Sequence, residues 1–251
     1  MISDPIFYVA AVIGVVFLGL AKGGFSGVGL VATPLIALTV PPVQAAAIVL
    51  PILLVQDVIS VWVYRRDWDA WNLKVLLPGA DIGIGAGWAL AAYVSESYVR
   101  LALGLIACAF VLNAWFGAEQ KVATLPSAFS GVMWGALSGF TSMISHAGAP
   151  PFQMHLLPQQ LDRIAFAATA AIFFAAVNMI KVVPFFLLGQ FSAENLATSA
   201  ALFPFAIVTN LLGIWLVRIM PTEWFYRVVY FLVFLISLEL IRGGLIGISV
   251  G

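Results

Sequence analysis

Residues 22–29 read Lys-Gly-Gly-Phe-Ser-Gly-Val-Gly, and they interrupt a long apolar region near the start of the chain. No further charged residue occurs before Asp57, although Thr33-Pro34 and Pro41-Pro42 interrupt the apolar sequence again. This uncharged stretch is longer than one membrane-spanning helix, which takes about 20 residues. Because glycine and proline end or kink helices, the stretch predicts a helix that is broken rather than continuous.

The composition of the whole chain is that of a membrane protein. Of its 251 residues, 63% are hydrophobic and only 9% are charged, whereas a soluble domain has about 25% charged residues. Eleven Lys and Arg residues balance eleven Asp and Glu residues, so there is no basic stripe to bind nucleic acid. A single cysteine, Cys108, cannot form an internal disulfide.

Charged residues separate apolar segments that are long enough to cross a bilayer. The candidate spans lie near 6–22, 43–64, 75–94, 98–116, 126–145, 161–181, 195–217 and 223–246. The sequence therefore predicts an all-α fold, a polytopic membrane helix bundle of about eight transmembrane helices embedded in the lipid bilayer.

A second uncharged stretch, between Lys121 and Asp162, repeats the order of the first at separations of 115 and 117 residues, and a pair further along the chain corresponds at 126. The aligned pairs are Gly24-Phe25-Ser26 with Gly139-Phe140-Thr141, Pro34 and Pro41 with Pro151 and Pro158, and Leu77-Pro78 with Phe203-Pro204. Glycine and proline are common in membrane helices in any case, but ordered matches favour a duplication. We expect two four-helix repeats with broken helices, 5–118 and 124–247, in which Gly24 and Gly139 occupy equivalent breaks.

Internal repeats with broken helices are typical of secondary transporters, and broken backbone at membrane depth is tolerated where it lines a cavity. The N-terminus of a half-helix presents unpaired N–H groups, which suit a small anion. Hydroxyl groups near the breaks would add donors. We therefore expect a small anionic solute in a cavity between the repeats.

The polar residues near the breaks are the candidates for the site. The predicted substrate-binding residues are Lys22, Gly24, Ser26, Gly27, Thr33, Gln56, Gly139, Thr141, Ser142, Ser145, His146 and Asn178, with Asp57 and His146 as candidates for coupling. Lys22 either extends to the membrane interface or supplies a cation. Asp57 is either a proton site or a structural partner of Lys22. Asn178 either binds solute or links helices, and Lys181 is expected to end the same helix.

The motif at 22–29, the Thr33-Pro34-Leu35 that follows it and the weaker second copy resemble the TauE/SafE family. Its members are called sulfite exporters or probable membrane transporters, and the resemblance covers essentially the whole chain. It implies a multi-pass protein of a bacterial-type inner membrane that moves sulfite or organosulfonates. The sequence has no Cys/His metal cluster, phosphate loop or haem ligand pair, so we expect neither a metal nor a cofactor, and it leaves a homo-oligomer open.

An intramembrane serine protease is the competing function. Residues 24–27, Gly-Phe-Ser-Gly, match the Gly-x-Ser-Gly string of rhomboid-type proteases, with Ser26 as nucleophile and His146 as base. The string is short, lies at the first helix, and carries Thr141 in its second copy. A structural motif explains that threonine, whereas a unique nucleophile does not.

Overall fold

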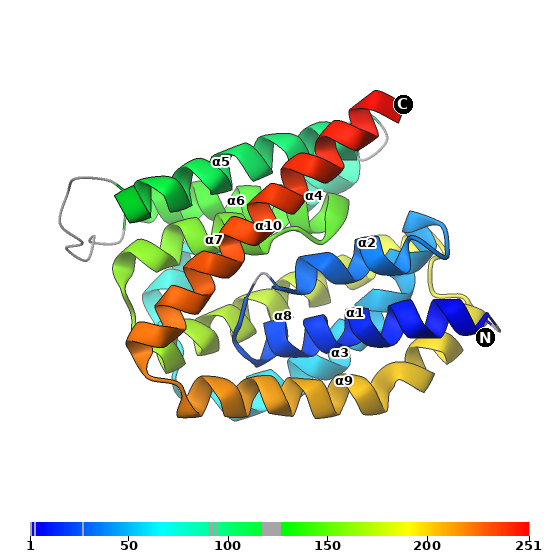
Figure 1. Ribbon diagram of the computed structural model, residues 1–251, viewed down its shortest axis with the longest axis horizontal. Helices are drawn as coiled ribbons and strands as arrows, with labels where there is room; N and C mark the ends of the chain where they lie inside the picture. Colours follow the sequence, from blue (N-terminus) through cyan, green and yellow to red (C-terminus); the bar gives the residue numbers. More distant parts are fainter. Residues whose placement is uncertain are drawn as a thin grey trace. The chain divides into compact units, whose positions relative to one another are not determined.

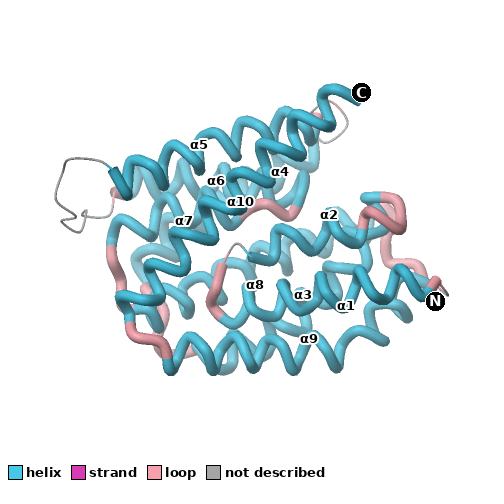
Figure 2. The backbone as a smooth tube through the Cα atoms, in the orientation of Figure 1, coloured by secondary structure: helices cyan, strands magenta, loops and turns pink. Residues whose placement is uncertain are grey.

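The structure is a computed structural model that describes residues 2, 4–26, 28–90, 93, 95–116 and 127–250. In these residues every regular element is a helix (Figures 1 and 2). In chain order the elements are α1 (Pro5–Gly23), the short 3₁₀ helix η1 (Val28–Val31), α2 (Ala32–Ile36), α3 (Pro42–Tyr64), α4 (Ala70–Leu90), α5 (Glu96–Phe116), α6 (Ala128–Ser145), α7 (Ala149–Leu156), the 3₁₀ helix η2 (Leu157–Gln159), α8 (Arg163–Leu187), α9 (Ala193–Ile219) and α10 (Thr222–Val250).

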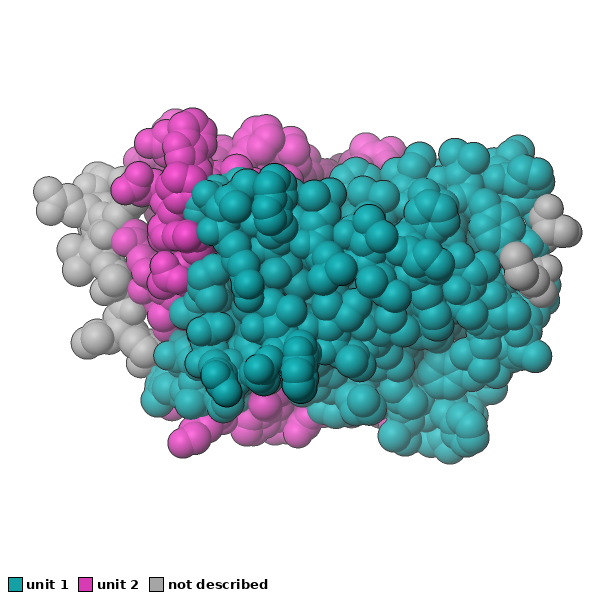
Figure 3. All heavy atoms as spheres, turned by 90° about the horizontal axis from the view of Figure 1, so that it is seen from below, with its two compact units in different colours: residues 1–73, 164–220 teal, residues 74–163, 221–251 magenta. Residues whose placement is uncertain are grey.

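The chain divides into two compact units, which Figure 3 colours separately. Unit 1 comprises residues 1–73 and 164–220, and unit 2 comprises residues 74–163 and 221–251. Unit 1 thus combines α1, α2 and α3 with α8 and α9, whereas unit 2 combines most of α4 with α5, α6, α7 and α10. Each unit takes helices from both halves of the sequence, so a compact unit is not one of the predicted repeats. The repeat boundaries stay a prediction, and 118 and 124 lie outside the described residues.

Seven described helices are long and apolar enough to cross a membrane. They are Pro5–Gly23, Gln44–Tyr64, Ala70–Leu90, Ser97–Phe116, Arg163–Leu187, Ala193–Ile219 and Thr222–Ser249. An eighth span was predicted at 126–145, and its residues 128–145 form α6, in which glycine, serine and threonine dilute the apolar residues. The prediction of a polytopic helical membrane protein is confirmed.

In unit 1, glycines bring α1 into close contact with α9. A Cβ atom added at Gly23 would lie 2.4 Å from the Cα atom of Gly213, and one added at Gly19 would lie 2.0 Å from the Thr209 hydroxyl. These residues lie four apart on each helix and form one small-residue face, as in other membrane helix pairs. The backbones approach this closely because no side chain separates them.

In unit 2, α4 and α6 approach each other in the same way. A Cβ atom at Gly83 of α4 would lie 2.0 Å from the carbonyl oxygen of Ala136, and one at Gly139 of α6 would lie 2.2 Å from that of Ala80. Carbonyl oxygens of a helix cannot move aside, so both positions require glycine for this distance between the helices.

We predict that Gly83→Ala lowers the stability of the protein, because the added methyl group forces α4 and α6 apart. Overpacking of this kind costs about 1–3 kcal/mol, which should lower the thermal unfolding midpoint in detergent by several degrees. Gly85→Ala in the same helix is the control, since no atom lies within 4 Å of its Cβ position. Equal midpoints for the two variants would contradict the close contact.

Candidate functional site

Helix α1 ends at Gly23 because the next residue takes a backbone conformation that no helix can continue. Gly24 has φ +137°, and its N–H donates to the carbonyl of Ala21. The N–H of Phe25 donates to the carbonyl of Leu20. These two bonds form a Schellman motif, in which glycine avoids the strain that a side chain would cause. The predicted break at Gly24 is confirmed.

Side chains of α3 bind the last carbonyls of α1. The Ser60 hydroxyl donates to the Lys22 carbonyl at 3.0 Å, and the Tyr64 hydroxyl donates to the Gly23 carbonyl at 2.7 Å. Both side chains are buried, and in a bilayer no water replaces such bonds. Helix α3 therefore fixes the position of the end of α1, and with it the base of the Lys22 side chain.

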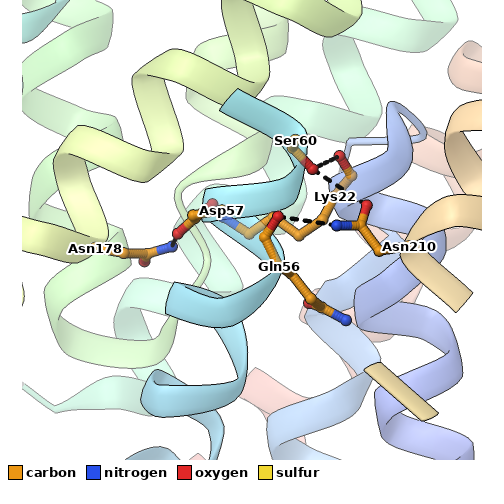
Figure 4. A network of polar contacts seen from close by, with 6 residues as sticks. All are labelled: Lys22, Gln56, Asp57, Ser60, Asn178 and Asn210. Carbon is orange, nitrogen blue, oxygen red and sulfur yellow. Dashed lines mark hydrogen bonds and ion pairs between the residues drawn. The ribbon is translucent and has the colours of Figure 1, made fainter. Parts of the chain in front are cut away.

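Lys22 and Asp57 form a buried ion pair between α1 and α3. The second carboxylate oxygen of Asp57 accepts a 2.7 Å hydrogen bond from the Asn178 amide of α8, so the carboxylate lies between the two side chains (Figure 4). The ammonium also lies 5.7 Å from the centre of the Phe174 ring, within cation–π range. The Lys22 and Asp57 side chains are only 9% and 5% exposed. Lys22 is thus the partner of Asp57, and it does not extend to the membrane interface.

A second buried lysine belongs to this cluster. Lys181 of α8 is 1% exposed, and its charge acts on both Lys22 and Asp57. The prediction that Lys181 ends its helix is wrong, because α8 continues to Leu187. Lys181 follows Asn178 by three residues, which places both on one face of α8.

Polar side chains link α3 to α9 beside the cluster (Figure 4). The Asn210 amide donates to the Gln56 carbonyl at 2.9 Å, and the Gln56 amide donates to the Ala206 carbonyl at 3.2 Å. The Gln56 side chain is fully buried, and its Oε1 has no hydrogen-bond partner among the described residues. Buried acceptors are rarely left unsatisfied, so Gln56 keeps an acceptor available for a further donor.

The other predicted residues of the first break are also buried. Ser26 is 4% exposed and Thr33 is 9% exposed. Both belong to unit 1, as the cluster does. Gly27 lies outside the described residues.

The second helix break lies at His146, which was expected to lie at it, and not at Gly139. Gly139 is inside α6, so the expectation of a break there is wrong. Gly139 allows the close contact with α4, and the backbone does not change direction there. Helix α6 continues to Ser145, and His146 ends it with a left-handed φ of 54°.

Hydroxyl groups hold the second break together. The Thr141 hydroxyl lies 2.8 Å from the Leu137 carbonyl and 2.9 Å from the Ala147 carbonyl, and the Ser145 hydroxyl donates to the Thr141 carbonyl at 3.4 Å. Ser142 is buried at 4% exposure. Because Thr141 and Ser145 donate to backbone carbonyls, binding an anion with these protons would require the bonds to be redirected.

The short helix after this break lacks the predicted row of backbone donors. Helix α7 begins at Ala149, and the next two residues, Pro150 and Pro151, have no N–H. The following N–H, of Phe152, donates to the Gly148 carbonyl. The half-helix expected to bind an anion through its N-terminus therefore offers few donors.

The structure distributes the predicted residues over both units. Unit 1 contains Lys22, Gly24, Ser26, Thr33, Gln56, Asp57 and Asn178, and unit 2 contains Gly139, Thr141, Ser142, Ser145 and His146. Within unit 1 the structure brings Lys22, Asp57 and Asn178 together and adds Lys181 to them.

Comparison with known proteins identifies the family of the chain. A family model described as "Sulfite exporter TauE/SafE" matches residues 11–240, which is nearly the whole chain. The chain belongs to the TauE/SafE sulfite exporter family. Searches of curated proteins and of solved structures found no match.

Membership of the TauE/SafE family decides between the two functions considered for the sequence. The family is one of membrane transporters, so the chain is a transporter and not an intramembrane protease. Together with the seven apolar helices, this makes it a multi-pass integral membrane protein of the bacterial inner-membrane type.

We predict that Asp57→Asn destabilises the protein more than Lys22→Gln does. Removing Asp57 leaves the buried Lys22 ammonium without its carboxylate partner, whereas removing Lys22 leaves the charge of Lys181 acting on Asp57. Breaking a buried pair costs about 3–5 kcal/mol, and we expect the upper part of this range for Asp57→Asn. The measurement is the thermal unfolding midpoint in anion-poor buffer. The double variant restores the formal charge and should regain part of the loss, whereas the reverse order of the single variants would contradict the role of Lys181.

Proposed function

We propose that this TauE/SafE protein exports a small sulfur oxyanion, sulfite or an organosulfonate, and that the cluster around Lys22 binds the charge of the substrate. The observation that carries this proposal is the nearly buried ammonium of Lys22, which is held by Asp57 at membrane depth. The name of the family supports the class of substrate.

An anion is costly to place at membrane depth unless fixed charges or donors compensate it. Lys22 is suited to this task because an ammonium has three donors. In the described part of the chain it makes one hydrogen bond, to Asp57. Two N–H groups therefore remain for the oxygens of a ligand at a place where the side chain is nearly buried.

We predict that Lys22→Gln weakens the binding of sulfite. The loss of one hydrogen bond to a charged group is worth about 1.5–3 kcal/mol, so the dissociation constant should rise roughly 10- to 100-fold. Thermal shift of the purified protein with sulfite, sulfate, taurine, sulfoacetate and thiosulfate measures this, since stabilisation grows with ligand concentration over the dissociation constant.

The control for this variant is Lys74→Gln, because Lys74 is an exposed lysine of α4. It should bind anions as the wild type does. Unchanged binding in Lys22→Gln would remove Lys22 from the site. If none of the five compounds stabilised the wild type, the proposed function would be wrong.

His146 stays a candidate for proton coupling. An imidazole titrates near physiological pH, and His146 ends α6 at the second break. His146→Gln keeps a polar side chain that cannot titrate, so it should flatten the pH dependence of sulfite flux in proteoliposomes. An unchanged pH profile would exclude His146 from coupling and leave Asp57 as the candidate.

A further inference from the structure

Helix α3 holds Lys22 at both ends of the residue. Asp57 pairs with the ammonium, and Ser60 donates its hydroxyl proton to the Lys22 backbone carbonyl at 3.0 Å (Figure 4). Asp57 and Ser60 are three residues apart, so they lie on one face of α3. A displacement of Lys22 when a ligand binds therefore also acts on the hydrogen bond of Ser60.

The Ser60 hydroxyl has one proton but lies within hydrogen-bond distance of two acceptors. The second acceptor is Oδ1 of Asn210 in α9, at 3.1 Å. The orientation of the Asn210 amide follows from its other contact, because its nitrogen donates to the Gln56 carbonyl at 2.9 Å and the reverse orientation would bring two acceptors together. Ser60 and Asn210 are fully buried, so bulk water does not supply a further proton. The hydroxyl can therefore serve fully only one of the two acceptors at a time.

Ser60 differs in this respect from another buried hydroxyl of unit 1. Ser199 of α9 lies 2.8 Å from the Ile48 carbonyl of α3 and 2.9 Å from the Asn195 carbonyl of its own helix. A hydroxyl of that kind keeps a local acceptor whatever the neighbouring helix does. Among the described residues, both acceptors of Ser60 belong to other helices, α1 and α9. The direction of its proton therefore decides to which of these helices it links α3.

The other bonds at the end of α1 do not depend on Ser60. The Schellman motif satisfies the carbonyls of Leu20 and Ala21, and the Tyr64 hydroxyl donates to the Gly23 carbonyl at 2.7 Å. Helix α1 thus stays attached to α3 through Tyr64 when the Ser60 hydroxyl turns to α9. Only the carbonyl of Lys22 then loses its donor.

We infer that Ser60 is a positioning residue for transport, whose proton is bonded to the Lys22 carbonyl in one state of the transport cycle and to Asn210 in the other. The two distances, 3.0 and 3.1 Å, favour neither acceptor, so a small shift of Lys22 decides between them. Ser60 in this way couples the lysine that binds the substrate to helix α9. The inference rests on the proposed function, in which Lys22 is the ligand, and adds a residue that acts through it.

The test compares Ser60→Ala with Ser199→Ala in the full-length protein. Each variant removes one buried hydroxyl group from a contact between α3 and a neighbouring helix, but only Ser60→Ala removes the link between Lys22 and α9. The probes are sulfite and taurine, and the comparison uses whichever of them the wild type binds.

Binding and flux should respond differently to Ser60→Ala. Isothermal titration calorimetry should give a dissociation constant within about threefold of the wild type, because Asp57 and Tyr64 still hold Lys22 and its helix. The maximal rate of flux in proteoliposomes, per folded protein, should fall roughly tenfold, which corresponds to the loss of one buried hydrogen bond in one state of the cycle. Ser199→Ala should keep both the affinity and the maximal rate.

Asn210→Leu provides a second test that leaves Ser60 intact. Leucine is similar in size but accepts no hydrogen bond, so the Ser60 proton stays on the Lys22 carbonyl. The maximal rate should again fall roughly tenfold with little change in affinity. The double variant with Ser60→Ala should lose no more than either single variant, because both changes act on the same hydrogen bond.

The outcomes separate the inference from the function on which it rests. If the wild type transports a probe and a folded Ser60→Ala or Asn210→Leu does so at the wild-type maximal rate, Ser60 is not a positioning residue, although the proposed function stands. An equal loss of rate in Ser199→Ala would assign the effect to a general loosening of helix contacts and would also overturn the inference. If Ser60→Ala does not fold, Asn210→Leu decides alone. If the wild type neither binds nor transports sulfite or taurine, the proposed function fails and the inference fails with it.

Discussion

A carboxylate in the apolar middle of a transmembrane helix has to be compensated by neighbouring charges and donors, and Asp57 of α3 is such a group. Lys22 and Asn178 supply that compensation, so helices α1, α3 and α8 meet at one point although they are distant in the sequence. Lys22 lies in the last turn of α1, which ends at the glycine break. That ending exposes carbonyls, and side chains of α3 bind them. The ion pair, the helix break and the capping by α3 therefore depend on one another.

Close approach of the helix backbones is the second requirement of this fold. Lipid tails are as apolar as leucine, so the hydrophobic effect does not hold membrane helices together, and close packing and interhelical hydrogen bonds take its place. Glycines provide this packing between α1 and α9 in unit 1 and between α4 and α6 in unit 2. Gln56 of α3 and Asn210 of α9 add hydrogen bonds between these two helices, because each side-chain amide donates to a backbone carbonyl of the other helix. Helix α3 is thus held on one side by α9 while its carboxylate faces Lys22 and Asn178.

The sequence was sufficient for those features that depend on local chemistry. Composition predicted a helical membrane protein, and the glycine-rich stretch predicted the break at Gly24. The second break was placed wrongly at Gly139 because glycine serves two purposes that look alike in a sequence, a positive φ at Gly24 and a close helix contact at Gly139. Lys181 was missed because a lysine near the end of an apolar segment looks like an interfacial residue. Only the packing of α8 against its neighbours makes it part of the cluster.

The polar positions of α3 and α8 that meet here also explain why the contact holds a single carboxylate. Asp57 and Asn178 are 121 residues apart, and the same 121 residues separate Pro42 and Arg163, the first residues of α3 and α8. The two side chains thus occupy the same position in their helices, and they bond to each other. Aspartate at both positions would bring two carboxylates together, and one would have to take up a proton. Asparagine at both would leave Lys22 without the carboxylate with which it pairs. One aspartate and one asparagine keep a single negative charge at this contact, and that charge forms the ion pair with Lys22 while the asparagine donates to the carboxylate.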